Sequence, residues 1–151
     1  MEKQEKINKL LIGFSFLLTL ISWNYVIYHF SNLPNKIVAH ISLKGEINRF
    51  DSKWVLWFIL AVFSAISLLI LWFSSKRKLH HIRLKDKMKQ KTATLLVLPF
   101  LAMIQFFVVF IMIHKTLNPS FNTSKILSFF SALTIVFLII YFKFTFKNIK
   151  K

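Results

Sequence analysis

The stretch WVLWFILAVFSAISLLILWFSS, from Trp54 to Ser75, decides the fold class of this chain. Its 22 residues contain no Asp, Glu, Lys or Arg. A helix rises about 1.5 Å per residue, so about 20 residues cross the ~30 Å hydrocarbon core of a bilayer. Because lipid offers the backbone no hydrogen-bond partners, a crossing segment of this length is expected to be helical.

Three further stretches share this length and apolar character. They are Leu10–Tyr28, Thr92–Ile113 and Ile126–Phe142, again without Asp, Glu, Lys or Arg. We place the spans at about residues 10–30, 54–75, 92–114 and 126–142, with a kink at Pro99 in the third. The sequence therefore predicts an all-α integral membrane protein with a single membrane domain, 1–151. Its expected architecture is an antiparallel four-transmembrane-helix bundle with a structured outer loop between the first two helices.

The composition supports a membrane protein and excludes several chemistries. Hydrophobic residues make up 56% of the chain, above the roughly 45–50% of soluble domains. The absence of Cys excludes disulfides, thiol catalysis and cysteine metal sites. No acid–base pair or activated nucleophile is recognisable, so we expect a protein that is not an enzyme and needs no cofactor.

The distribution of positive charge predicts the orientation in the membrane. Lys and Arg total 21 against 5 Asp and Glu, which favours anionic lipid headgroups, and not nucleic acid, as the partner. The two tails and the segment 76–91 hold 15 of the 21, and the loops 29–53 and 114–125 hold 6. The positive-inside rule therefore places both termini in the cytoplasm. We expect the basic inner loop, 76–91, to fix this topology; the alternative is a docking site for a cytoplasmic regulator.

Three polar residues lie at a similar depth inside the predicted spans. Asn24 and Gln105 each fall about 20 Å from the cytoplasmic end of their span, and Thr134 of the fourth span is placed at a similar level. Hydrogen bonds between helices are the expected role, and a polar binding pocket is the alternative. No charged residue lies deep in a span, which argues against a pump or a proton-coupled transporter.

The outer loop, 29–53, carries the most informative motif, LPNKIVAHISLKGEINRFDSK from Leu33 to Lys53. It resembles the bacterial membrane family called domain of unknown function 1648, whose pattern is roughly L-P-x-x-I-P-x-H-x-N-x-x-G-x-x-D-x-x-x-S-K. With the flanking helices, the similar segment covers about residues 10–75. The matched positions, which we take as a candidate recognition loop, are Leu33, Pro34, Ile37, His40, Gly45, Ser52 and Lys53.

The resemblance also implies a function. This domain forms the N-terminal part of SdpI-like immunity proteins, so the resemblance implies a bacterial cytoplasmic membrane and a role in toxin-peptide immunity or membrane signalling. Three positions depart from the family pattern: Val38 replaces a proline, Ser42 an asparagine and Asn48 an aspartate. The downstream region of SdpI-like proteins, with its G-x-R, Thr and Trp positions, is not found here.

The loop itself has two interpretations. As a structural cap, Pro34 ends the first helix, Gly45 turns the chain and Ser52 caps the second helix. As a recognition surface, its charged residues bind an external peptide or a lipid headgroup. His29, His40 and His114 fall near the same outer face, but their spacing has no metal signature, so no metal is expected there. We expect a non-enzymatic binding protein; the alternative is a transport or permeation accessory protein.

Overall fold

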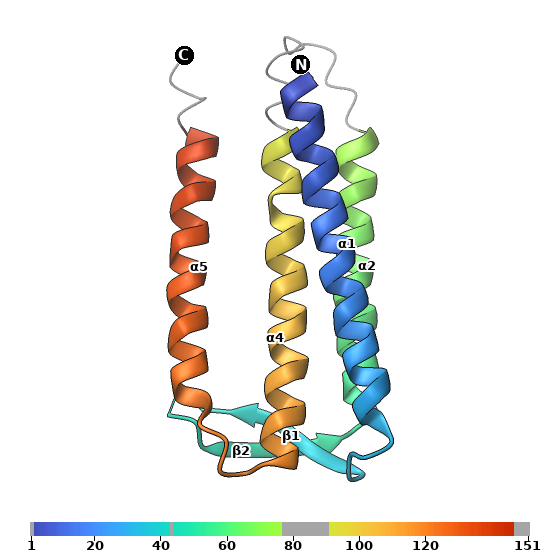
Figure 1. Cartoon of the computed structure of the whole chain (residues 1–151), viewed down its shortest axis with the longest axis vertical. Helices are drawn as coiled ribbons and strands as arrows, with labels where there is room; N and C mark the ends of the chain where they lie inside the picture. Colours follow the sequence, from blue (N-terminus) through green and yellow to red (C-terminus); the bar gives the residue numbers. More distant parts are fainter. Residues whose placement is uncertain (1, 43, 77–90, 147–151) are drawn as a thin grey trace.

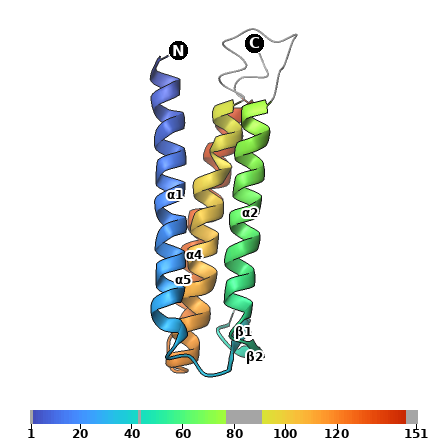
Figure 2. The same cartoon turned by 90° about the vertical axis from the view of Figure 1, so that its right-hand side faces the viewer.

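The computed structural model describes residues 2–42, 44–76 and 91–146 of the chain. Four long helices run along the longest axis of the molecule and a β-hairpin lies across one end (Figures 1 and 2). The N-terminal end of α1 and the C-terminal end of α5 lie at the opposite end (Figure 1). In chain order, the elements are α1 (Glu2–Phe30), β1 (Lys36–Ile41), β2 (Ile47–Ser52), α2 (Val55–Lys76), α4 (Val97–Leu117) and α5 (Thr123–Phe146).

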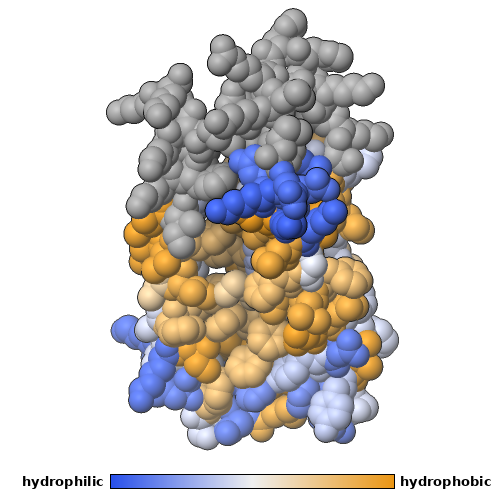
Figure 3. Space-filling model, turned by 45° about the horizontal axis from the view of Figure 1, so that its top comes forward, coloured by the Kyte–Doolittle hydropathy of each residue, from blue (hydrophilic) through white to orange (hydrophobic). Residues whose placement is uncertain are grey.

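The helices have the length and composition of membrane spans. Three helical segments are long and apolar enough to cross a bilayer: Glu2–Phe30, Val55–Ser74 and Lys91–Leu117. The apolar part of α5, Thr123–Ile139, is shorter. Many large apolar side chains on these helices point outward, which suits contact with lipid and not with water. Figure 3 shows this surface as a broad apolar belt with hydrophilic residues beyond it on both sides. The predicted membrane character is thereby confirmed.

Two helices differ from their predicted boundaries. Helix α1 begins at Glu2, before the predicted start of the apolar span, and its first turns carry the ion pairs Glu2–Lys6 (2.8 Å) and Glu5–Lys9 (3.1 Å). Pairs of this i,i+4 spacing stabilise exposed helical turns. The third span is interrupted by a turn at Leu96, between helical residues 91–95 and α4. Pro99 cannot donate a hydrogen bond one turn back, which accounts for this irregularity and agrees with the predicted kink.

The core lies where α1, α2 and α4 meet the hairpin. Helices α1 and α4 run in the same direction and α2 runs against them (Figure 1). A cluster of apolar side chains from these helices and β1 is fully buried there: Val26, Ile37, Leu56, Leu60, Val109 and Ile113. Helix α5 lies outside this core. It packs on α4 through stacked rings, Phe107–Phe130 (4.2 Å) and Phe100–Phe137 (4.4 Å).

The predicted structured loop is a two-stranded antiparallel sheet, so the all-α prediction misses two strands. The register pairs Lys36 with Ser52 and His40 with Arg49, and irregularities flank His40. Two adjacent residues of β1, Ile37 and Val38, are both buried, which breaks the alternation expected of a regular strand. Because the alternation is broken, the two-residue hydrophobic period that predicts a strand is missing from the sequence here.

Candidate functional site

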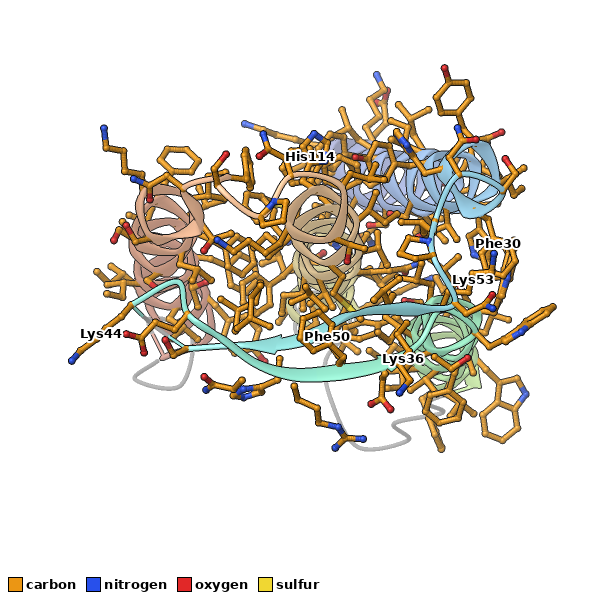
Figure 4. The ribbon with its side chains drawn as sticks, turned by 90° about the horizontal axis from the view of Figure 1, so that it is seen from below. Phe30, Lys36, Lys44, Phe50, Lys53 and His114 are labelled. Atoms are coloured by element: carbon orange, nitrogen blue, oxygen red, sulfur yellow. The ribbon has the colours of Figure 1, made fainter. Side chains whose placement is uncertain are left out.

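The hairpin is held against the adjacent ends of the helices by its first strand. It extends from the start of α2, past α4, to the start of α5 (Figures 1 and 4). Ile37 and Val38 are buried against the bundle. The backbone N–H of Val38 donates to Thr116 Oγ1 of α4 at 2.9 Å, and the Thr116 hydroxyl donates to the carbonyl of Met112 at 2.6 Å. This chain of bonds links the edge of the sheet to the last turns of α4.

The tip of the hairpin rests on the start of α5. Gly45 has a φ of +88°, a conformation that side chains of L-residues disfavour. Its N–H donates to the Ser42 carbonyl at 2.9 Å, which closes the turn. A Cβ atom at this position would lie 2.9 Å from Thr123 Oγ1, a buried oxygen. The predicted role of Gly45 in turning the chain is therefore confirmed, and the glycine also permits close contact with α5.

Replacing Gly45 by alanine is expected to destabilise the protein by about 1–2 kcal/mol. The positive φ and the close approach to Thr123 both oppose a methyl group. Thermal unfolding in detergent, followed by circular dichroism, measures the loss. Gly13→Ala is the matched control because its added Cβ would meet no atom within 4 Å apart from the neighbouring residues and the backbone of its own helix. Equal stability of the two variants would contradict the contact between the hairpin tip and α5.

The base of the hairpin is organised by Lys53. Its ammonium group donates to the carbonyls of Phe30 (3.3 Å) and Leu33 (3.1 Å) and lies 4.8 Å from the centre of the Phe30 ring. Its backbone N–H donates to the Asn35 carbonyl at 3.0 Å. Phe30 is the last residue of α1, where carbonyls lack helical partners and the helix dipole favours a cation. Figure 4 shows Lys53 turned toward Phe30, between the ends of α1 and α2.

The seven residues of the predicted recognition loop thus separate into two groups. Leu33, Ile37, Gly45 and Lys53 hold the hairpin in place, whereas Pro34, His40 and Ser52 are exposed. The hydroxyl of Ser52 lies 3.5 Å from the N–H of Trp54, at the limit of a hydrogen bond. Its predicted capping role is therefore a weak contact just before α2 begins.

The outward surface of the hairpin combines polar groups with one exposed aromatic ring. Asn48 Nδ2 and His40 Nδ1 are 3.4 Å apart across the two strands. Arg49, the register partner of His40, forms an ion pair with Asp51 at 2.6 Å. The side chain of Phe50 is 57% exposed. We call the exposed residues His40, Asn48, Arg49 and Phe50 together the outer face; because successive residues of β2 alternate between the two sides of the sheet, these four side chains do not all lie on one side. The sequence did not single out Phe50. In a chain with 18 phenylalanines, residue type alone does not show which ring is exposed.

Two positions of the family pattern, His40 and Asn48, lie next to each other on this surface. His40 stands at the histidine of the family pattern, and Asn48 stands where that pattern has an aspartate. The structure brings these two positions side by side, on opposite strands. The amide of Asn48 keeps the hydrogen-bonding contact to the imidazole but carries no charge.

His29 and His114, predicted to lie near the same end as His40, belong to a separate aromatic cluster. Tyr25 Oη and His114 Nδ1 are 2.6 Å apart, and the His114 ring stacks on Phe110 at 4.2 Å. His29 lies against Tyr25, with ring centres 4.6 Å apart, and 6.5 Å from the ring of His114. His40 lies on the outer face and is not part of this cluster. Among the described residues, no group of three His, Cys, Asp or Glu side chains is placed to hold a metal ion.

The three intramembrane polar residues are not brought into one pocket. Asn24 is exposed and donates to the Leu20 carbonyl of its own helix at 2.8 Å. Thr134 donates to the Phe130 carbonyl of its own helix at 2.9 Å. Gln105 is fully buried, and within the described part of the chain neither polar atom of its amide has a hydrogen-bond partner. Of these three residues, Gln105 alone has its side chain in the interior of the protein, where a polar binding pocket would need it.

The basic inner loop, predicted at 76–91, falls almost entirely outside the described residues, which end at Lys76 and resume at Lys91. Its proposed partner therefore stays a prediction. The charge that motivates it, eight Lys and Arg residues in this segment, is a property of the sequence.

Comparison with known proteins gives a match that covers the hairpin and the adjoining halves of α1 and α2. No curated protein and no solved structure matches the chain. A family model matches residues 17–65, about a third of the chain, from the middle of α1 to the middle of α2. Residues 17–65 therefore match the family described as Domain of unknown function (DUF1648), which confirms the resemblance seen in Leu33–Lys53.

Proposed function

We propose that this protein is a non-enzymatic, multi-pass protein of the bacterial cytoplasmic membrane that binds an external peptide through its hairpin. In this proposal, four helices cross the membrane, both termini are cytoplasmic and the hairpin faces outward. Binding serves immunity to a membrane-active toxin peptide or membrane signalling, as the resemblance to SdpI-like proteins implies. The single observation that carries the proposal is the outer face, which lies within the matched segment 17–65.

The outer face has the features of a small binding surface. Phe50 offers an exposed ring, and aromatic residues and arginine are enriched where binding energy concentrates. Arg49 is held by its ion pair with Asp51, and His40 by its contact with Asn48, so both side chains are partly ordered before a ligand arrives. The support beneath is rigid, because Ile37 and Val38 are buried and Lys53 ties the base to α1.

Phe50→Ala is expected to weaken peptide binding by about 2 kcal/mol, roughly 30-fold in Kd, and His40→Ala by less. A sensitive bacterial strain carrying the gene is challenged with a panel of secreted membrane-active peptides, with survival counted and membrane potential followed by a dye. Protection by the unaltered protein, lost in these two variants, is the expected result. Both side chains are exposed, so neither change is expected to unfold the hairpin.

Lys125→Ala is the matched control, because Lys125 is exposed at the start of α5 and outside the hairpin. The orientation is checked in the same cells with a Lys44→Cys variant, since the chain has no other cysteine for a reagent to label. Labelling of this variant from outside is expected. No protection against any peptide, with the protein present in the membrane and the Lys44→Cys variant labelled from outside, would remove the immunity proposal.

The alternative, a transport or permeation accessory protein, is supported by one observation, the unpartnered amide of Gln105 in the core, among the residues that the structure describes. The positions of Asn24 and Thr134 do not add to it, because both bond to their own helices. Solute flux through vesicles containing the protein, with and without Gln105→Leu, tests this alternative. Loss of a measured flux in that variant would favour it over peptide recognition.

A further inference from the structure

A groove between α1 and α2 lies apart from the outer face and is independent of the function proposed above. Its volume is about 420 Å³, within the roughly 300–1,000 Å³ of small-molecule sites. Ser15 and Thr19 of α1 form one wall, Ser67 and Leu71 of α2 form the other, and Leu98 lies on α4. Figure 2 shows α4 between and behind the two helices, so α4 forms the floor.

The lining favours an apolar ligand. The hydroxyls of Ser15 and Thr19 donate to carbonyls of their own helix, those of Leu11 (2.6 Å) and Ser15 (2.9 Å). Trp23 Nε1 donates to Ser64 Oγ at 3.2 Å and joins the two walls at the end nearer the hairpin. These donors are already satisfied, so they place no demand on a ligand. A hydrocarbon chain is therefore compatible with the lining at Ser15, Thr19 and Trp23.

The length of the groove is close to that of one leaflet of a bilayer. Along α1 it extends from Ile12 to Trp23, which is about 16 Å at 1.5 Å per residue. This is about half of the ~30 Å hydrocarbon core. The groove begins near Leu10, where the apolar part of α1 starts, and its far end at Trp23 lies about 20 Å from Leu10, somewhat past the middle of the ~30 Å core. Phe16 and Leu68 on its lining are 65% and 66% exposed, so the groove opens sideways toward lipid.

Charge at the open end indicates the kind of lipid. Lys3, Lys6 and Lys9 lie in the α1 turns that precede the groove. Lys6 and Lys9 form exposed ion pairs with Glu2 and Glu5, whereas Lys3 forms no such pair among the described residues. Helix α2 ends at Lys76 at the same end of the molecule, where the exposed Lys91 begins the next helical segment. Each such charge near an anionic lipid surface contributes about 1 kcal/mol of attraction. We propose that the groove binds one acyl chain of an anionic phospholipid, with the headgroup at the N-terminal end of α1.

Photolabelling in vesicles tests this site. The protein is reconstituted in phosphatidylcholine containing a little phosphatidylglycerol with a diazirine in the middle of one chain, and labelled peptides are identified by mass spectrometry. Labelling is expected to concentrate in residues 12–23 and 64–71 relative to α5. Thr19→Leu and Ser67→Leu narrow the groove from opposite walls, and each is expected to reduce this labelling at least threefold. Because the two variants are independent, misfolding of one leaves the other as a test.

Ser131→Leu is the matched control, because Ser131 is exposed on α5 and its hydroxyl also donates to its own helix. Its labelling is expected to equal that of the unaltered protein. Even labelling over all the helices, or labelling that both groove variants leave unchanged, would overturn the site. Equal labelling by a phosphatidylcholine probe with the same chain would overturn the anionic headgroup. Disulfide-linked dimers of a Leu68→Cys variant would overturn the lipid by assigning the groove to a second copy.

Discussion

Replacing Lys53 by methionine is expected to lower the free energy of unfolding by about 2–4 kcal/mol. Methionine keeps much of the apolar length of the side chain but donates no hydrogen bond. The carbonyls of Phe30 and Leu33 then lose a charged donor, and hydrogen bonds to charged groups contribute about 1.5–3 kcal/mol each. The contact of the ammonium group with the Phe30 ring is lost as well. Thermal unfolding in detergent, followed by circular dichroism, measures the effect.

Lys36→Met is the control for this prediction. Lys36 is an exposed lysine at the start of β1, so its loss removes one charge from the same hairpin without removing an internal bond. A change near zero is expected there. If both variants unfold at the same temperature as the unaltered protein, Lys53 does not hold the hairpin to α1. The exposed residues His40 and Phe50 therefore test recognition more cleanly than Lys53, whose loss would reduce binding by disturbing the support.

Replacing Gln105 by leucine is expected to raise the free energy of unfolding by about 1–3 kcal/mol. The amide of Gln105 is fully buried and both of its polar atoms are unpartnered within the described residues. A buried polar group without a hydrogen bond costs about 1–3 kcal/mol, which a leucine of similar size avoids. The rise is measured by the same thermal unfolding.

Thr134→Val provides the matched control, because the Thr134 hydroxyl lies at a similar predicted depth but already donates to the Phe130 carbonyl. Its replacement by an isosteric side chain is expected to change the stability little. A loss of stability in Gln105→Leu would show that the amide has a bound partner in the folded protein. That result would weaken the transport alternative, because the amide would then be a stabilising structural contact, whereas a polar group kept at a cost in stability is typical of a functional position.

The membrane helices were predictable because their signal is strong and local. Each apolar run is long enough to span a bilayer, and the kink near Pro99 follows from one missing donor. The extension of α1 to Glu2 was not predicted, because its first turns are polar and are stabilised by ion pairs that an apolar window does not count. The position of α5 outside the core was also hidden, since composition does not show which neighbour a helix contacts.

The hairpin was harder to predict than the helices. The register irregularities at His40 and the adjacent buried residues Ile37 and Val38 remove the two-residue period by which a strand is recognised. Within the hairpin, Gly45 correctly predicted a turn, because glycine readily adopts the positive φ that this turn uses. The segment therefore looked like a compact loop, and the two strands appear only when their pairing and the surface of α4 are known.

For the candidate site, the type of a residue did not predict whether its side chain points inward or outward. Lys53 is charged and was expected to be available to a ligand, but the free carbonyls at the end of α1 draw it inward. Asn24 and Gln105 have similar predicted depths, yet one faces outward and the other inward. Depth follows from counting along a helix, whereas the face depends on which helices are neighbours, and the parallel pairing of α1 with α4 could not be read from the chain.

The docking of the hairpin on α4 has a consequence for how the chain assembles. Segment 17–65 ends before α4, yet Val26 and Ile37 of this segment share a buried cluster with Val109 and Ile113 of α4, and the N–H of Val38 bonds to Thr116 of α4. An excised fragment of residues 17–65 would leave these groups facing lipid or water. We therefore expect that the matched segment does not fold as an autonomous unit, and that its hairpin docks during synthesis only after the third span has emerged from the ribosome and entered the membrane.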